Sequence, residues 1–125
     1  MQNGVLSRID DPDLRAYVIW VPMFRGAERD VPRATREVAD ARSLHYWDGA
    51  SASMRAVRAT LNLSEDAWDI FLLYPPGIRW TGDTPPKPEF WMHQLGSESN
   101  PQLNGPYLDP ATFLARTQAM LTAKE

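Results

Sequence analysis

Two histidines are the residues of this chain best suited to acid–base or metal chemistry. His45 lies three residues before Asp48 at the end of an apolar run, and His93 follows Trp91 in a later run. A histidine beside a carboxylate can act as a general base with an orienting acid, or the pair can share a metal ion. The candidate catalytic residues of a hydrolase or lyase are therefore His45, Asp48 and His93.

A structural role competes with the catalytic one. In an alternating strand His45 shares a face with Trp47, and Asp48, which directly follows, can cap the next turn. Metal sites usually need three or more protein ligands, and this pair supplies two. We therefore favour the structural role for His45 and Asp48, and we expect no metal and no cofactor.

Aromatic residues around His93 indicate a ligand site as a further possibility. If Phe90–Leu95 is a strand, Trp91 and His93 share a face and could line a pocket suited to an aromatic or anionic ligand. The alternative, which we favour for the tryptophans, is that they cover the end of the core. The residues expected to line the ligand site are Trp47, Arg79, Trp80, Trp91 and His93.

The absence of cysteine excludes several chemistries. A chain with no Cys forms no disulfide, carries no thiolate nucleophile and has no thiol–disulfide oxidoreductase activity. Phosphate-binding loops, nucleophile elbows and dinucleotide fingerprints are also missing from the sequence. A net charge of −3 with scattered arginines provides no basic patch, so we expect no nucleic-acid partner.

Length and composition are typical of one small domain. The 125 residues are 43% hydrophobic, enough for a real core, and we expect a single domain over residues 1–125. The N-terminus lacks the basic start and apolar run of a signal peptide, and no apolar run approaches the roughly 20 residues that span a membrane. We therefore expect a cytoplasmic protein that does not contact a membrane.

The first half of the chain alternates strand and helix patterns. Leu14–Phe24 is almost continuously apolar, and a strand without alternation is expected to be buried on both faces. A helix is predicted over Pro32–Ala41 with Asp30 as its cap. A short strand over Leu44–Trp47 and a second helix over Ser53–Leu61 follow.

The second half is centred on the stretch AWDIFLLYPPGIRW. A central strand is predicted over Trp68–Tyr74, then a turn at Pro75-Pro76-Gly77 with trans peptide bonds. Ile78–Trp80 is expected to return as its antiparallel partner. Asp69 would then pair with Arg79 across the hairpin, because a buried unpaired charge is costly.

The clearest helix signal is the last one. Asp109 is a good cap, Pro110 suits the first helical position, and an apolar stripe follows at helical spacing. Together with a short strand over Phe90–Leu95, the order is β-α-β-α-β-β-β-α. This order predicts an α/β fold with a mixed sheet flanked by helices.

This order resembles the thioredoxin-like fold, in the branch of the peroxiredoxins and thiol–disulfide reductases. The resemblance covers Leu14–Glu125, with AYVIWVP, LHYWD and WDIFLLY in the places of that fold's strands. The stretches VIWVPMF, HYWD, AWDIFLLYPPG and FWMHQL also resemble a bacterial branch of the superfamily. The resemblance implies a thioredoxin-like mixed sheet flanked by helices.

Departures from the family remove its redox chemistry. The first strand and the Cys-x-x-Cys helix are absent, since only Val5–Ile9 precedes the first strong strand. Every cysteine is missing, and Ser64–Ala67 stands where the family has its cis-proline. The resemblance therefore implies a non-redox binding or interaction protein with a small-molecule or protein ligand. A shortened domain with no ligand is the remaining alternative.

The missing strand also predicts a homodimer. In the family's sheet that strand is interior, so Tyr17–Val21 and Ile70–Tyr74 must pair directly or leave an open edge. A second copy of the chain could cover the edge or the bared sheet face.

Overall fold

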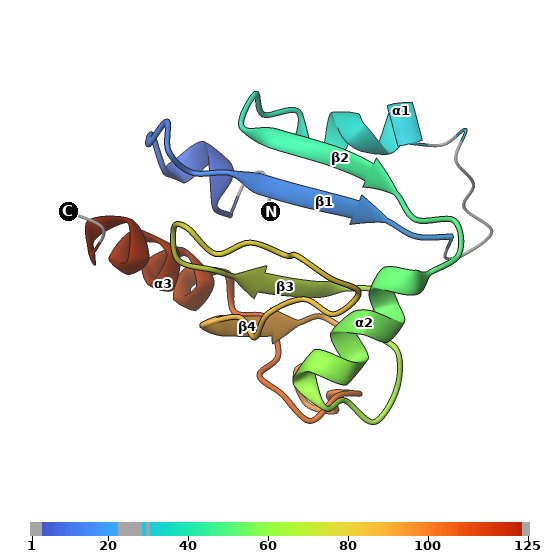
Figure 1. Cartoon of the computed structure of the whole chain (residues 1–125). Coiled ribbons are helices and arrows are strands. Elements are labelled where there is room, and N and C mark those ends of the chain that lie inside the picture. The colour runs from blue at the N-terminus through green and yellow to red at the C-terminus, as the bar shows by residue number, and fades with distance from the viewer. Residues whose placement is uncertain (1–3, 23–28, 30, 124–125) are drawn as a thin grey trace. The chain divides into compact units, whose positions relative to one another are not determined.

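The fold is α/β, as expected from the sequence, with two two-stranded sheets and helices (Figure 1). The structure, a computed structural model, describes residues 4–22, 29 and 31–123. The chain divides into an N-terminal unit, Met1–Ser53, and a C-terminal unit, Met54–Glu125, and each is described by itself. A single domain with one thioredoxin-like sheet stays a prediction.

The N-terminal unit contains a parallel pair of strands, β1 (Ala16–Trp20) and β2 (Ser43–Trp47). Their register places Ala16 opposite Ser43 and Trp20 opposite Trp47. A 3-10 turn over Leu6–Arg8 precedes β1, and the connection to β2 contains α1 (Val31–Thr35) and a second 3-10 turn over Arg36–Val38.

The helix predicted over residues 32–41 is therefore too long. Helical structure ends at Val38, and Asp40 begins a turn in which its carboxylate accepts the backbone N–H of Arg42 at 2.8 Å. The Ser43 hydroxyl contacts the carbonyl oxygens of Val38 and Asp40 at 3.1 and 2.6 Å. These side chains satisfy the carbonyls that a longer helix would have used, so the helix stops early. Asp30, the expected cap, lies outside the described residues.

Exposure alternates along both strands of the parallel pair. Tyr17 and Ile19 of β1 are exposed, whereas Val18 and Trp20 are partly buried. The expectation that the first strand is buried on both faces is therefore wrong within this unit. The Nε2 atom of His45 lies 3.0 Å from the carbonyl oxygen of Val38, which places the connecting segment on the opposite face from Tyr17.

The C-terminal unit contains an antiparallel pair, β3 (Ile70–Leu73) and β4 (Phe90–His93). Ile70 lies opposite His93, and Leu73 lies opposite Phe90. The predicted return strand over residues 78–80 is wrong: these residues form no strand and are exposed. The strand predicted to begin at Phe90 takes that place instead.

Two hydroxyl groups explain why the chain pairs with β3 only after a long loop. Tyr74 donates its hydroxyl to the carbonyl of Pro86 at 2.8 Å, and Thr60 donates to the carbonyl of Pro85 at 2.9 Å. These bonds place the end of the loop so that the backbone N–H of Glu89 reaches the carbonyl of Leu73 at 3.0 Å. All peptide bonds among the described residues are trans, as expected for the two prolines after β3.

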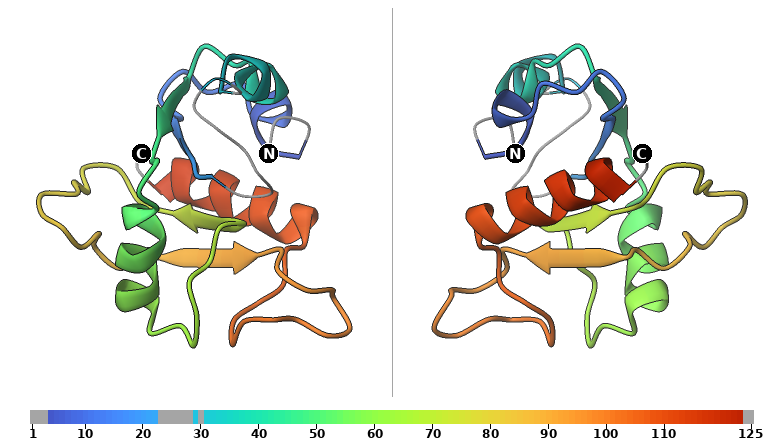
Figure 2. Two further views of the ribbon diagram at one scale, coloured as in Figure 1. Left: turned by 90° about the vertical axis from the view of Figure 1, so that its right-hand side faces the viewer. Right: turned by 90° about the vertical axis from the view of Figure 1, so that its left-hand side faces the viewer.

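Helices pack on the antiparallel pair. Both views in Figure 2 show α3 (Pro110–Ala123) running alongside β3 and β4. The Phe113 ring contacts Phe71 and Phe90, with centroid separations of 6.1 and 6.2 Å. The opposite face of the β3–β4 pair carries Ile70, Leu72 and Trp91. These side chains pack against a second cluster that includes Val57 of α2 (Ala52–Leu61). The buried members of that cluster are Val57, Leu63, Ala67, Leu95 and Leu103.

Candidate functional site

His93 is fully buried, with 0% exposure, and both of its ring nitrogens are engaged. Its Nδ1 atom accepts the backbone N–H of Leu95 at 3.1 Å, so the ring proton is on Nε2. That Nε2–H donates to the carbonyl of Gly105 at 3.1 Å. The imidazole therefore ties β4 to the 94–105 loop, and neither nitrogen is directed at a ligand.

His45 is engaged in the same way in the N-terminal unit. Its Nδ1 atom accepts the indole N–H of Trp20 at 3.0 Å, which again assigns the proton to Nε2. Nε2–H donates to the carbonyl of Val38 at 3.0 Å, with the Ser43 hydroxyl 3.3 Å away. This network links β1, β2 and the segment between them.

Asp48 takes the capping role that we favoured. Its carboxylate accepts the backbone N–H groups of Ala52 and Ser53 at 3.2 and 2.7 Å and the Ser53 hydroxyl at 2.5 Å. These are the first N–H groups of α2, which have no partner within the helix. His45, whose nitrogens are used elsewhere, is not hydrogen-bonded to this carboxylate.

The expected ligand-site residues lie in different parts of the chain. Trp47 belongs to the N-terminal unit and the other four to the C-terminal unit. Trp91 and His93 are neighbours, with ring centroids 6.1 Å apart, and Trp91 packs against the core. Arg79 and Trp80 are exposed in the loop after β3, where the indole N–H of Trp80 donates to Gly82. Their joint role in ligand binding stays a prediction.

The expected ion pair between Asp69 and Arg79 does not form. Among the described residues the ion pairs are Arg42–Asp40 and Arg58–Asp66. Arg79 follows the turn into the exposed loop, because β3 pairs with β4 rather than with residues 78–80. Burial raises the pKa of the Asp69 carboxyl above its ordinary value.

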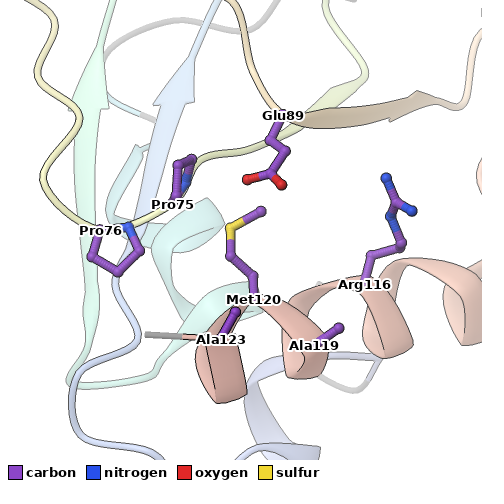
Figure 3. Close-up of a pocket in the computed structure, with 7 residues that line it drawn as sticks. All are labelled: Pro75, Pro76, Glu89, Arg116, Ala119, Met120 and Ala123. Carbon is purple, nitrogen blue, oxygen red and sulfur yellow. The ribbon is translucent and has the colours of Figure 1, made fainter. Parts of the chain in front are cut away.

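A groove in the C-terminal unit escaped the sequence analysis. It has a volume of about 580 Å³ and is bordered by the two prolines after β3, by the residue before β4 and by one side of α3 (Figure 3). The helix residues recur at the spacing of a single helix face. The lining residues are Pro75, Pro76, Glu89, Arg116, Ala119, Met120 and Ala123.

Small residues explain why a groove forms at this place. Ala119 and Ala123 are one helical turn apart, and their short side chains leave a recess between α3 and the proline turn. Met120, one of the residues of the apolar stripe predicted along this helix, lies in this recess and is only partly buried. The sequence contains these two alanines one helical turn apart, but the spacing alone does not reveal which segment of the chain lies opposite them.

Opposite charges stand at the groove. Figure 3 shows the side chains of Glu89 and Arg116 extending into the space between α3 and the start of β4. The Arg116 guanidinium lies 4.4 Å from the centroid of the Phe90 ring, a cation–π contact that holds it in place. Within the described part of the chain neither Glu89 nor Arg116 belongs to an ion pair. Both charges can therefore face a ligand.

Comparison with known proteins found no match among protein-family models, curated proteins or solved structures. No helix in residues 4–22 and 31–123 is both long and apolar enough to cross a membrane. Over the same residues, no three His, Asp or Glu side chains gather in a way that could hold a metal ion.

Proposed function

We propose that this chain is a non-redox, thioredoxin-like binding protein whose ligand lies in the groove between the proline turn, Glu89 and α3. The observation that carries the proposal is the pair of opposite charges, each without an ion-pair partner among the described residues, beside an apolar floor. Ligand sites are concave and mostly apolar, with a few polar groups that orient the ligand.

The order of elements supports the thioredoxin-like part of the proposal. Along the chain it is β1-α1-β2-α2-β3-β4-α3, with a parallel first pair and an antiparallel second pair. The resemblance predicts a strand, a helix, a second strand, a second helix, a strand with a hairpin partner and a last helix. β4, rather than residues 78–80, is that partner. Without cysteine, such a domain retains a binding surface and no redox centre.

The groove favours a short apolar peptide with both termini charged. An α-ammonium group can pair with Glu89, and a carboxylate can accept two parallel N–H bonds from the planar Arg116 guanidinium. The apolar middle of such a ligand would lie on Met120 and the proline rings. A volume of about 580 Å³ suits a ligand of a few residues.

Histidine chemistry supports the rival hydrolase or lyase less well. The nitrogens of His45 and His93 are used in hydrogen bonds within the fold, and neither histidine is bonded to a carboxylate. A general base must reach the proton that it removes, directly or through one water molecule. No observation in the described residues therefore favours catalysis over binding.

Isothermal titration calorimetry with leucyl-leucine tests the proposal. We expect binding that weakens at least tenfold when the peptide is N-acetylated or the protein carries Glu89→Gln, with little further loss when both changes are combined. C-terminal amidation of the peptide and Arg116→Gln should each weaken binding to a similar extent, again with little further loss when the two are combined. Each pair is a double-mutant cycle, which isolates the contact between one charge and one peptide terminus.

Matched controls separate this groove from the aromatic surface predicted from the sequence. Glu98→Gln changes an exposed carboxylate that does not line the groove, and it should leave the affinity unchanged. Arg79→Gln should also have no effect. If Arg79→Gln abolishes binding while Arg116→Gln does not, the groove is the wrong site. If neither leucyl-leucine nor its blocked forms bind at millimolar concentration, the peptide proposal fails.

A further inference from the structure

Four large apolar side chains stand on one face of the β1–β2 pair. Tyr17 and Ile19 of β1 are 64% and 40% exposed, and Leu44 and Tyr46 of β2 are 47% and 51% exposed. The strands lie side by side in Figure 1, with Tyr17 opposite Leu44 and Ile19 opposite Tyr46. They form one contiguous patch, which we call the β1–β2 face.

The composition of β1 indicates that this face is normally covered. Parallel strands occur almost only in sheets that are covered on both sides, and their sequences read as continuous apolar runs. Residues 16–22 form such a run, yet within the N-terminal unit only the face that carries Trp20 and His45 is covered. A contiguous exposed apolar patch on a folded protein usually marks an interaction site.

We infer that a second copy of this chain covers the β1–β2 face and forms a two-fold symmetric dimer. The pattern of the face is self-complementary: each tyrosine has an aliphatic neighbour both along its strand and across it. A two-fold axis in the plane between the two facing sheets, either parallel or perpendicular to the strands, therefore places each tyrosine on an aliphatic residue of the copy. Aromatic rings pack well on such side chains and can keep their hydroxyls in water at the rim.

The chemistry of the face favours a copy of itself over a charged partner. None of its four side chains carries a charge, so a basic or acidic partner would lose hydration without gaining an ion pair. The four side chains expose a few hundred Å², less than the roughly 800 Å² per partner of a standard stable complex. The dimer should therefore dissociate in the micromolar range. The inference rests on the exposure and pairing of these four side chains and does not depend on the ligand groove.

Sedimentation velocity from about 1 to 500 µM tests the interface. We expect wild-type protein to pass from monomer to dimer across this range, and Leu44→Lys to weaken the dimer at least thirtyfold. Ile78→Lys is the matched control, because Ile78 is 49% exposed in the loop after β3 and lies outside the face. It should leave the dimer unchanged. Circular dichroism establishes that each variant keeps its secondary structure.

Mixing two oppositely charged variants distinguishes the two possible orientations of the two-fold axis of the dimer. With the axis parallel to the strands, residue 44 faces residue 17 of the copy, so Leu44→Lys and Tyr17→Glu proteins should form a mixed dimer. With the perpendicular axis, Leu44→Lys should instead pair with Tyr46→Glu. A wild-type chain that stays monomeric at 500 µM overturns the inference, as does a dimer that Leu44→Lys does not weaken. Neither result bears on peptide binding, which calorimetry measures separately with substitutions in the groove.

Discussion

Both carboxylate oxygens of Asp40 accept hydrogen bonds from Arg42, at 2.9 Å from Nε and 2.8 Å from a terminal nitrogen. The other guanidinium contacts are backbone carbonyls of the N-terminal segment: those of Leu6 and Ile9 at 2.6 Å and that of Asp11 at 3.1 Å. One arginine thus joins the segment before β1 to the turn before β2. Asp40 holds the guanidinium in the orientation in which its donors reach those carbonyls.

Replacing Arg42 with lysine should destabilise the chain almost as much as replacing it with alanine. A lysine ammonium is a single donor centre and cannot span the carboxylate and three carbonyls at once. We expect both variants to lower the thermal unfolding midpoint. The decrease for Arg42→Lys should be at least half of the decrease for Arg42→Ala. Arg33→Lys, on the exposed side of α1, is the control. Equal stability of Arg42→Lys and wild type would contradict this role.

Asp40 should make stability sensitive to acid. Hydrogen bonds from Arg42 hold the pKa of Asp40 at about 2, below the value of about 3.9 in an unfolded chain. The ionised carboxylate therefore contributes stability that is fully present above about pH 4 and is lost as the pH falls toward 2. Urea unfolding from pH 7 to 2.5 should show wild type losing its advantage over Asp40→Asn in that window. A constant difference across the range would refute the linkage.

Asp69 should act in the opposite direction. Burial raises the pKa of its carboxyl, so the folded chain binds a proton that the unfolded chain releases. Its contribution to stability therefore falls as the pH rises from about 3.9 to the raised value. Asp69→Asn should stabilise the protein at pH 7 by about 1 kcal/mol or less, since the site is partly exposed to solvent. Asp83→Asn, in an exposed loop, should change nothing in the same urea titration.

Two glycines with the same backbone conformation should respond differently to alanine. Gly77 and Gly96 have φ of 86° and 84°, where a side chain is strained. A Cβ atom at Gly77 would meet nothing within 4 Å, whereas at Gly96 it would lie 2.5 Å from the carbonyl oxygen of Asn100. Gly77→Ala should cost about 1 kcal/mol, the strain alone, and Gly96→Ala at least twice that. Chemical unfolding measures both, and equal losses would contradict the close contact.

Phe90 should affect ligand binding without lining the groove. Its ring holds the Arg116 guanidinium by a cation–π contact that is worth about 0.5–1 kcal/mol at an exposed site. Phe90→Leu should therefore weaken leucyl-leucine binding by about two- to fivefold and leave its dependence on Glu89 unchanged. Phe71→Leu removes the other ring that contacts Phe113 and serves as the calorimetric control. Equal effects of the two substitutions would show that packing alone is responsible.

Local signals in the sequence determined much of the secondary structure. The β2 strand and the opposite directions of His45 and Tyr46 follow from alternation along a short run, and α3 begins at Pro110, directly after Asp109, as predicted. The absence of cysteine excludes thiol–disulfide chemistry within this chain. These properties depend on residues within a few positions of one another, where propensity and capping act.

Tertiary structure decided the partner of β3, the state of the histidines and the position of the groove. β3 pairs with β4 across a long loop, and Tyr74 and Thr60 donate hydrogen bonds to carbonyls of that loop, contacts that no local pattern encodes. The ring nitrogens of His93, a candidate catalytic residue, are both hydrogen-bonded to the backbone, one to Leu95 and the other to Gly105. The groove joins residues on either side of that loop with a helix face. Contacts between segments far apart in sequence depend on how the whole chain packs, so only the folded structure reveals them.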